Sequence, residues 1–355
     1  MLHRINKALP LTWLDPKTLQ IGLGEKQKRL AEVTITEEKI IEALVSGIVA
    51  GQESVLEETI QAEAGTTAKL IQLLGSSTQS IDQQSYGPWQ ELAFAELARA
   101  SLDYEVNGEM VIAERWQKIV HVDQLDKAGL LLTKGLMASG IGLVVSHDEG
   151  VVLRTDLGEL GYPSEELGKQ RAEAANRICN SLSSTTNYLN RVKLLAGKPI
   201  DQKISFGVTV GHLAIAPRTY SRWLSRDVNH LAINFELDGA MVSPIVKPGS
   251  TPCLNCFQEH LVDVDQSWPI VGSQLLNLPR VRDDSAALLS TVGLALRSIL
   301  RNLDEQSGFQ FRDNQNEYEL GYKIEYSSGN VSRMKFMKHE LCSCGNFTET
   351  GSNTY

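Results

Sequence analysis

The chain has 355 residues, more than the roughly 250–300 residues at which one hydrophobic core stops growing, so its length favours two domains. With 42% hydrophobic and 22% charged residues, a net charge of −9 and no basic run, the sequence argues against a nucleic-acid binder. The most apolar region, Leu130 to Val145, is interrupted by Lys134 and by glycines, and it is too short to span a bilayer. The N-terminus lacks an apolar core of signal-peptide length. We therefore expect a cytoplasmic protein with neither a nucleic-acid partner nor a membrane.

The first 85 residues combine strand-like and helical patterns. Leu11–Leu14 and Leu19–Leu23 flank turn chemistry, and Ala31–Ile35 continues the alternation with Val33 and Ile35. Thr36 is then the predicted N-cap of a helix, and two shorter helices follow from Ser54 and from Thr66 or Thr67. The order predicts a winged-helix-like α+β domain over residues 1–85, whose polar end, 76–85, is a linker. A linking helix is predicted within 86–116, with its pattern starting at Trp89.

From residue 117 the pattern changes to α/β. A buried-type strand at Gln117–Val122, a helix at Gln124–Ser139 and a second strand at Leu143–Val145 form the βαβ unit of a parallel sheet. Further elements are predicted as a helix at 168–182, strands at 204–210, 231–235 and 241–246, and a helix at 285–300. Residues 117–330 are thus predicted to be a Rossmann-like domain with a mostly parallel sheet, followed by a C-terminal tail, 331–355, that carries metal ligands.

The five cysteines give the strongest local signal. Cys253 and Cys256 form a CxxC pair, and Cys342 and Cys344 form a second tight pair. Two short pairs far apart in sequence commonly build a closed tetrahedral zinc site, and cytoplasmic cysteines seldom form disulfides. We predict a structural Zn²⁺ on these four thiolates. The alternatives are two unrelated thiol pairs or a redox-active CxxC, while Cys179 is predicted to be a core residue.

A family resemblance rests on the order of motifs. A strand–helix–strand unit, an aspartate at a strand end, a Gly-Lys-x-Arg helix start and the Pro-Gly-x-x-Pro-Cys-x-x-Cys segment at 248–256 follow one another. Over about 118–345 the chain resembles ThiF/MoeB-type (HesA/MoeB/ThiF) activating enzymes. It resembles more narrowly the ThiF-like cyclodehydratase or leader-peptide-binding proteins of thiazole/oxazole-modified peptide pathways. The resemblance implies a Rossmann-like fold with an ATP·Mg²⁺ site, and we also expect a homodimer.

The phosphate loop that the resemblance implies is altered in this sequence. Such a loop is rich in glycine after the first strand, so that phosphates approach the backbone at a helix N-terminus. Here residues 121–127 contain no glycine before Gly129, and Asp123 and Asp126 bring negative charge. The position at which the family has its catalytic aspartate corresponds to about His212 in this sequence, so that aspartate is in doubt as well.

Three residues match the rest of that nucleotide site. The family's Asp-x-Asp is reduced to Asp148, and Lys169 and Arg171 occupy its two basic positions, whereas Glu159 stands where an arginine would face phosphate. Losing one electrostatic donor can cost roughly 10²–10³ in rate. The sequence therefore argues against efficient adenylation and against ATP·Mg²⁺ as a cofactor, with Asp148, Lys169 and Arg171 as the contacts if nucleotide binds.

The front domain resembles the RiPP recognition element, which captures an extended leader peptide on a sheet edge. The resemblance places the peptide on the strand with Val33 and Ile35 and on the helix with Leu70 and Leu74. A packing appendage or a dimerisation arm is the alternative.

The combined prediction is a degenerate ThiF-like scaffold that binds a leader peptide and presents it to a partner, such as a YcaO-type modifying enzyme. Two alternatives stay open. The first is an adenylyltransferase acting on the C-terminal carboxylate of a peptide or protein, and the second is a regulatory or structural homodimer. Outside these sites, Asp263 and Asp265 are predicted to be helix caps or loop ligands, with a metal contact as the alternative.

Overall fold

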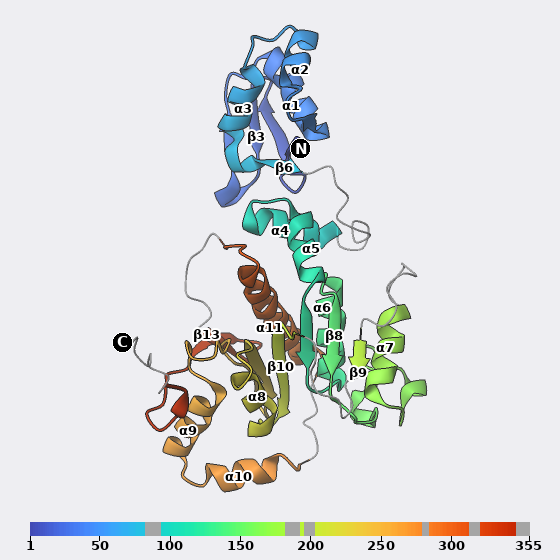
Figure 1. Cartoon of the computed structure of the whole chain (residues 1–355), viewed down its shortest axis with the longest axis vertical. Coiled ribbons are helices and arrows are strands. Elements are labelled where there is room, and N and C mark those ends of the chain that lie inside the picture. Colours follow the sequence, from blue (N-terminus) through green and yellow to red (C-terminus); the bar gives the residue numbers. More distant parts are fainter. Residues whose placement is uncertain (82–93, 182–191, 195–202, 279–283, 312–319, 346–355) are drawn as a thin grey trace, which may run out of the picture. The chain divides into compact units, whose positions relative to one another are not determined.

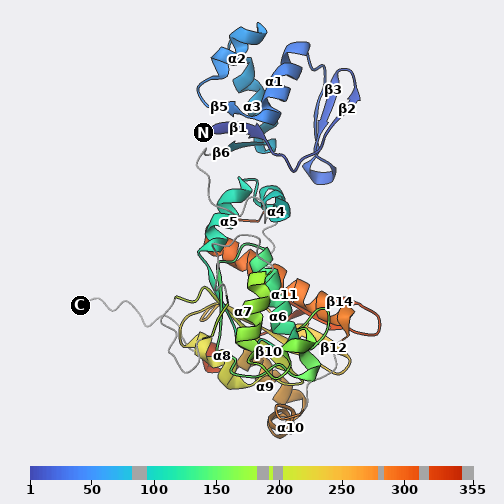
Figure 2. The same ribbon diagram turned by 90° about the vertical axis from the view of Figure 1, so that its right-hand side faces the viewer.

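The computed structural model describes residues 1–81, 94–181, 192–194, 203–278, 284–311 and 320–345. The chain divides into two compact units (Figures 1 and 2). Unit 1 contains Met1–Glu114 and residues 309–311, and unit 2 contains Arg115–Gly308 and residues 320–345.

Unit 1 holds two antiparallel three-stranded sheets, with strand orders β2-β3-β4 and β5-β1-β6. The strands are β1 (Leu2–Ile5), β2 (Leu11–Asp15), β3 (Thr18–Ile21), β4 (Lys28–Leu30), β5 (Ile48–Val49) and β6 (Thr78–Ile81). The helices are α1 (Ile35–Ser46), α2 (Glu53–Ile60), α3 (Thr66–Leu74), α4 (Phe94–Tyr104) and α5 (Gly108–Trp116), the last of which continues into unit 2. Phe309 and Phe311 pack on Tyr104 with ring centroids 5.8 and 6.0 Å away.

The predicted strand at Ala31–Ile35 is wrong. The strand before this stretch, β4, ends at Leu30, and Thr34, not Thr36, caps α1. The Thr34 hydroxyl accepts a hydrogen bond from the Glu37 amide at 3.2 Å, and the Glu37 carboxylate accepts one from the Thr34 amide at 2.8 Å. This capping box fixes the start of a helix. Ile35 is consequently the first residue of α1, with 74% of its surface exposed.

The core of unit 1 also corrects two expectations. Leu70 and Leu74 are 4% and 0% exposed and pack in this core, so they cannot line an open peptide groove. The stretch predicted as a linker contains β6, which pairs with β1. The polar composition of this stretch suggested a linker, but Gln79 and Ile81 are the buried, inward-facing positions of a strand. The predicted helix from Trp89 is described from Phe94 onward as α4, and α5 follows it.

Unit 2 is built on one eight-stranded sheet with the order β14-β13-β12-β11-β10-β7-β8-β9. The strands are β7 (Ile119–Val122), β8 (Leu143–Ser146), β9 (Val192–Leu194), β10 (Phe206–His212), β11 (His230–Phe235), β12 (Gly239–Val242), β13 (Leu320–Glu325) and β14 (Val331–Lys335). The five strands from β9 to β11 run parallel, and the pairs from β11 to β14 are antiparallel. The predicted Rossmann-like, mostly parallel sheet is confirmed. The strand predicted to reach Val246 ends at Val242, shortly before Pro244, whose nitrogen cannot donate to a ladder.

Helices cover both faces of this sheet (Figure 1). The helices of unit 2 are α6 (Lys127–Ala138), α7 (Arg171–Ser181), α8 (Pro217–Leu224), α9 (Leu254–Val264), α10 (Trp268–Leu275) and α11 (Ser285–Gln306). One core joins α6, α7 and α11 to the sheet, and a second joins α8 and α9 to it. Of the helices that the structure describes, α11 alone is long and apolar enough to cross a membrane, but half of its most apolar window is buried, as in a core helix.

Candidate functional site

The carboxyl ends of β7, β8 and β10 form the place where an open α/β sheet binds ligands. β7 pairs with β8 on one side and with β10 on the other. The chain runs outward from β7 to β9 and then returns to the other side of β7, so the crevice between β7 and β10 is a topological switch point. We call these three strand ends the switch edge. It carries Asp123, the Ser146–Asp148 segment and His212.

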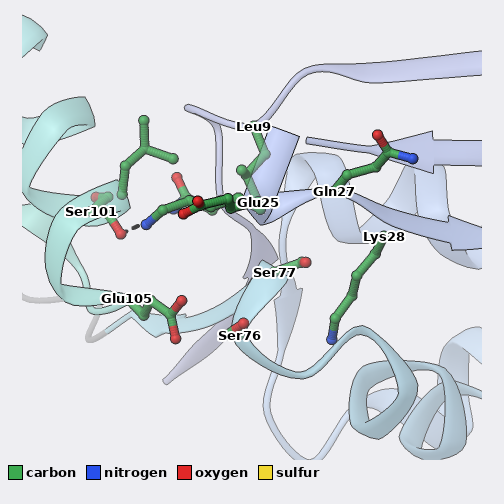
Figure 3. Close-up of a pocket in the computed structure, with 11 residues that line it drawn as sticks. Leu9, Glu25, Gln27, Lys28, Ser76, Ser77, Ser101 and Glu105 are labelled. Atoms are coloured by element: carbon green, nitrogen blue, oxygen red, sulfur yellow. Dashed lines mark hydrogen bonds between the residues drawn. The ribbon is translucent and has the colours of Figure 1, made fainter. Parts of the chain in front are cut away.

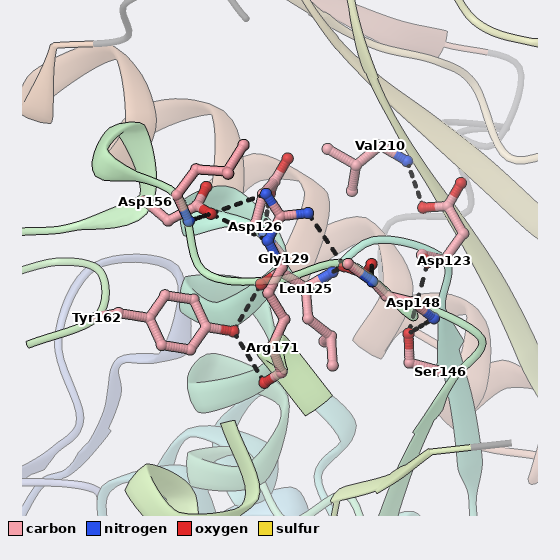
Figure 4. Close-up of polar contacts among 12 residues, drawn as sticks. Asp123, Leu125, Asp126, Gly129, Ser146, Asp148, Asp156, Tyr162, Arg171 and Val210 are labelled. Carbon is pink, nitrogen blue, oxygen red and sulfur yellow. Dashed lines mark hydrogen bonds and ion pairs between the residues drawn. The ribbon is translucent and has the colours of Figure 1, made fainter. Parts of the chain in front are cut away.

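Two carboxylates bridge the crevice of the switch edge, and Figure 4 shows the first of them, Asp123, beside Val210. Asp123 Oδ1 accepts a hydrogen bond from the Val210 amide of β10 at 2.8 Å. Asp126 Oδ2 lies 2.8 Å from His212 Nε2, and its Oδ1 accepts from the Gly129 amide at 3.0 Å as the N-cap of α6. A helix N-terminus favours negative charge and readily binds anions. In this chain the Asp126 carboxylate occupies the N-terminus of α6, where an anion would otherwise bind.

A buried network of Asp148, Arg171 and Asp156, here called the Asp/Arg network, lies beside it (Figure 4). Asp148 accepts hydrogen bonds from the amides of Leu125, at 2.7 Å, and Gly150, at 2.8 Å. Arg171 Nη1 lies 3.4 Å from Asp148 Oδ2, while its Nε and Nη2 donate to Asp156 Oδ2 at 3.0 and 2.8 Å. Both oxygens of Asp148 are therefore engaged within the chain.

The structure separates the three predicted nucleotide contacts. Asp148 and Arg171 meet, but Lys169 is half-exposed and pairs with Glu166 at 3.3 Å. Sequence reasoning missed Asp156, which takes most of the Arg171 hydrogen bonds, and Tyr162, whose hydroxyl donates to the Leu125 carbonyl at 2.6 Å. No spacing rule links an arginine to an aspartate fifteen residues earlier in an irregular segment.

Gly129, in the first turn of α6, has a packing role. A Cβ on Gly129 would lie 1.9 Å from the Gln124 carbonyl oxygen, so the first turn of α6 sits too close to the preceding loop for any side chain. The two glycines further on, Gly140 and Gly142, precede β8 at its amino end, away from the switch edge. A Cβ on Gly142 would meet the Trp116 carbonyl oxygen at 1.8 Å.

Burial dominates the electrostatics of the switch edge. It raises the pKa of Asp123 to about 7, against the lowering effect of the Val210 hydrogen bond. Asp123 Oδ2 has no hydrogen-bond partner among the described atoms. Burial, with Arg222 second, holds the pKa of His121 well below its usual value, so that its ring is neutral. His121 Nε2 lies 2.8 Å from His147 Nδ1.

A cavity of about 250 Å³ opens near the carboxyl ends of β10 and β11. Leu213 and Asn234 line it from the sheet side, and Phe257 and Trp268 line it from α9 and α10. Leu213 has a positive φ of 68°, which is uncommon for a branched side chain. The Asn234 side-chain oxygen has no partner in the described part of the chain, so a ligand's N–H or O–H could satisfy it.

The four predicted zinc ligands come together in the core that joins α8 and α9 to the sheet. Sγ–Sγ distances are 3.9 Å for Cys253–Cys256, 3.5 Å for Cys253–Cys342 and 3.3 Å for Cys256–Cys344. Four thiolates at about 2.3 Å from a tetrahedral Zn²⁺ stand about 3.8 Å apart. The spacing and the donor set fit such an ion, so this cysteine cluster could hold a metal. Burial raises the pKa of Cys253 and of Cys344, whereas hydrogen bonds from the Cys344 backbone and the Asn255 side chain lower the pKa of Cys342 to about 7 against the effect of burial.

In unit 1 the sheet β2-β3-β4 has β4 at one edge, and β4 has no second strand partner among the described residues. A small cavity of about 70 Å³ lies beside it (Figure 3), lined by Leu9, Lys28, Ser77 and Glu105 among others. The Lys28 ammonium donates to the Leu74 carbonyl at 2.7 Å, which ties β4 to the end of α3. On α3 the large apolar side chain that is exposed is Leu73, at 60%.

No family model and no curated protein matches this sequence. Solved structures do match. MccB from E. coli with ATP is 15% identical, covers 97% of this chain and 99% of its own, and has a TM-score of 0.64. The Microcin C7 biosynthetic enzyme MccB in complex with N-formylated MccA is 14% identical over 97% of this chain and 100% of its own, with a TM-score of 0.63. PaaA is 12% identical over 94% and 100%, with a TM-score of 0.66.

These similarities extend over both units. At such low identity they establish the fold and leave the chemistry open. The chain thus shares its fold with MccB and PaaA, and this agrees with the predicted Rossmann-like sheet and small N-terminal α+β domain.

Proposed function

We propose that this chain is a peptide-binding protein of a peptide-modification pathway that uses a ThiF-like fold as a scaffold and does not adenylate its peptide efficiently. The observation that carries this proposal is the state of the switch edge. Its helix N-terminus is capped by Asp126, and the Leu125 amide is taken by Asp148. Arg171, a buried cation that contacts Asp148, is neutralised by Asp148 and Asp156. A triphosphate would have to displace these anions from their own donors.

The peptide half of the proposal rests on unit 1 and on the neighbours. MccB structures contain the MccA peptide, and this chain covers almost the whole of MccB. A free sheet edge accepts an extended peptide through main-chain hydrogen bonds, with side-chain pockets providing selectivity. We place the peptide along β4, with one side chain in the cavity beside Lys28 and another on Leu73 of α3.

The remaining parts of the proposal are the metal, the compartment and the partners. We propose Zn²⁺ in the cysteine cluster, because four thiolates with no open position suit a structural zinc. Reduced thiols fit the cytoplasm. The partner is a modifying enzyme, such as a YcaO-type protein, which supplies the ATP chemistry. A homodimer is part of the same proposal.

An adenylyltransferase is the second candidate. The ATP complex of MccB shows that this fold can hold the nucleotide, so the neighbours do not argue against ATP. The cavity beside Asn234 provides room for a substrate next to the switch edge. In this alternative, ATP displaces Asp148 from the Leu125 amide, and Arg171 then turns toward phosphate.

Calorimetric titration with ATP·Mg²⁺ separates the two candidates. We expect no binding at millimolar nucleotide and no exchange of labelled pyrophosphate into ATP when peptides encoded beside the gene are added. Asp148→Asn removes a negative charge from the edge and serves as a comparison, because a site blocked by charge should then gain nucleotide affinity. Micromolar ATP binding by the unaltered chain, with peptide-dependent exchange, would contradict the scaffold and support the adenylyltransferase.

Fluorescence anisotropy with the same labelled peptides tests the peptide site. Leu73→Glu places a charge on the proposed contact and should weaken binding about tenfold or more, since burying one leucine side chain contributes about 1.5–3 kcal/mol. Val55→Glu on α2 is the matched control, because Val55 is also 60% exposed. Equal affinities for the two variants would exclude the β4–α3 surface.

A further inference from the structure

A second group of metal-ligand side chains lies outside the cysteine cluster. His260 and Asp263 are one turn apart on α9, and His339 belongs to the segment after β14. One ligand atom from each of the three lies within 4.8 Å of the other two. His339 Nε2 is 2.9 Å, and His260 Nδ1 3.9 Å, from the same oxygen of Asp263. The two imidazole rings meet edge to face with centroids 4.8 Å apart.

The backbone orients the first of these rings. His260 Nε2 lies 3.1 Å from the Met337 carbonyl, which can only accept, so Nε2 carries the proton. Nδ1 of the neutral His260 ring then carries a lone pair and lies 3.9 Å from an Asp263 carboxylate oxygen, a contact that does not stabilise either acceptor. Metal-binding histidines have this arrangement, with one ring nitrogen donating to a carbonyl and the other left for the ion.

We propose that His260, Asp263 and His339 bind a divalent transition-metal ion of the Zn²⁺, Co²⁺ or Ni²⁺ type, separate from the metal of the cysteine cluster. Two imidazoles and one carboxylate are ligands for these ions, and the three leave at least one coordination position open to water. The Asp263 side chain is 62% exposed and that of His260 is 41% exposed, so an ion can enter from solvent. An exposed aspartate is also free to draw in toward the ion.

Binding has one structural consequence at His339. Its Nδ1 accepts from the Leu341 amide at 3.2 Å, so Nε2 holds the ring proton in the metal-free protein. A neutral ring that binds a metal through Nε2 carries its proton on Nδ1, so Nδ1 becomes a donor and the Leu341 amide must turn away from it. The turn is free to do so, because Leu341 is 81% exposed.

The site joins the same two segments as the cysteine cluster. Cys256, His260 and Asp263 lie at successive turns along one side of α9, and His339 precedes Cys342 by three residues. The Cys342 amide donates to the His339 carbonyl at 3.0 Å. An ion bound by His260, Asp263 and His339 therefore forms a second, exchangeable metal cross-link between α9 and the segment after β14.

Metal counting on the full chain tests the proposal. Protein stripped with a strong chelator is reloaded with Zn²⁺ or Co²⁺ and dialysed against metal buffered in the micromolar range. Bound ion is then counted by mass spectrometry. We expect two ions per chain, one of which exchanges readily. Asp263→Asn and His260→Ala should each bind one ion less, whereas His3→Ala, a half-buried histidine of unit 1, should bind as many as the unaltered chain.

Cobalt absorption distinguishes the two sites. Thiolate-to-cobalt charge-transfer bands report the cysteine cluster, and they should persist in Asp263→Asn and His260→Ala. Because Asp263 is on the surface, its substitution keeps the fold intact, which circular dichroism checks. An unaltered chain that binds no ion beyond the one with thiolate bands would overturn the proposal. An ion count that is the same in both variants as in the unaltered chain would also overturn it.

Discussion

The cysteine cluster and the Asp/Arg network both gather ionisable groups inside unit 2, but they differ in what neutralises them. In the cysteine cluster, four sulfurs surround a centre and have chiefly one another as neighbours. In the Asp/Arg network, Asp148 and Asp156 enclose Arg171, and the amides of Leu125, Gly150 and Leu153 also donate to these two carboxylates. The first arrangement requires an added cation to be stable as thiolates, whereas the second is complete without a ligand. The predictions below test that difference, from the largest expected effect to the smallest.

Removing the metal of the cysteine cluster should have the largest effect. Structural zinc contributes about 10–16 kcal/mol of apparent binding free energy in small zinc domains, and part of it is folding free energy. We expect Cys256→Ser or strong chelation to lower the free energy of unfolding of unit 2 by several kcal/mol and its melting temperature by more than 10 °C. Calorimetry with and without chelator measures it, and an unchanged melting temperature would contradict a structural metal.

Breaking the Asp/Arg network should come next. Arg171→Met removes the cation that neutralises the buried Asp156, which typically costs about 3–5 kcal/mol. Urea unfolding measures this loss. The variant Arg171→Met with Asp156→Asn and Asp148→Asn removes the stranded charges together and should recover much of the stability. If the triple variant is as unstable as Arg171→Met alone, charge is not the cause.

The buried carboxyl of Asp123 predicts a pH-dependent effect. Its pKa is raised from 3.8 to about 7 in the folded chain, so the folded state holds a proton that the unfolded state has already released. Stability from this group is full below pH 3.8, falls between pH 4 and 7, and is lost above pH 7, by about 4 kcal/mol at about 1.4 kcal/mol per pKa unit. Asp123→Asn should thus be more stable relative to the unaltered chain at pH 8 than at pH 5. A pH-independent difference in urea midpoints would show that Asp123 is ionised throughout.

Lys169→Ala should have the smallest effect. Its half-exposed ion pair with Glu166 is of the kind that contributes about 0–1 kcal/mol. We expect a change in the free energy of unfolding of at most about 0.5 kcal/mol and no change in nucleotide titration. A marked effect on ATP binding would restore Lys169 as a nucleotide contact.

Sequence patterns predicted the parts of this protein that depend on local spacing. The βαβ unit from β7 to β8 and the pairing of Cys253 and Cys256 follow from periodicity and from the reach of a helix turn. The strand at Ala31–Ile35 was wrong because Val33 and Ile35 alternate as in a strand. Thr34 and Glu37, spaced as a capping box, already marked a helix start there.

Other features depend on contacts that no local pattern encodes. Whether Leu70 and Leu74 face a core or a groove depends on what packs over α3. Which anion neutralises Arg171 depends on how residues 148–171 fold back on the sheet. The burial of Leu70 and Leu74 and the partners of Arg171 could therefore be learned only from the structure.

The distance in sequence between the two halves of the cysteine cluster has a consequence for biosynthesis. Cys253 must wait for a partner 89 residues further along the chain. On the ribosome, the parallel strands can assemble while both early thiols are still exposed to oxidants and to stray metal ions. The final closure of unit 2 is therefore timed by the emergence of the last hairpin, β13 to β14, and of the two cysteines that follow it.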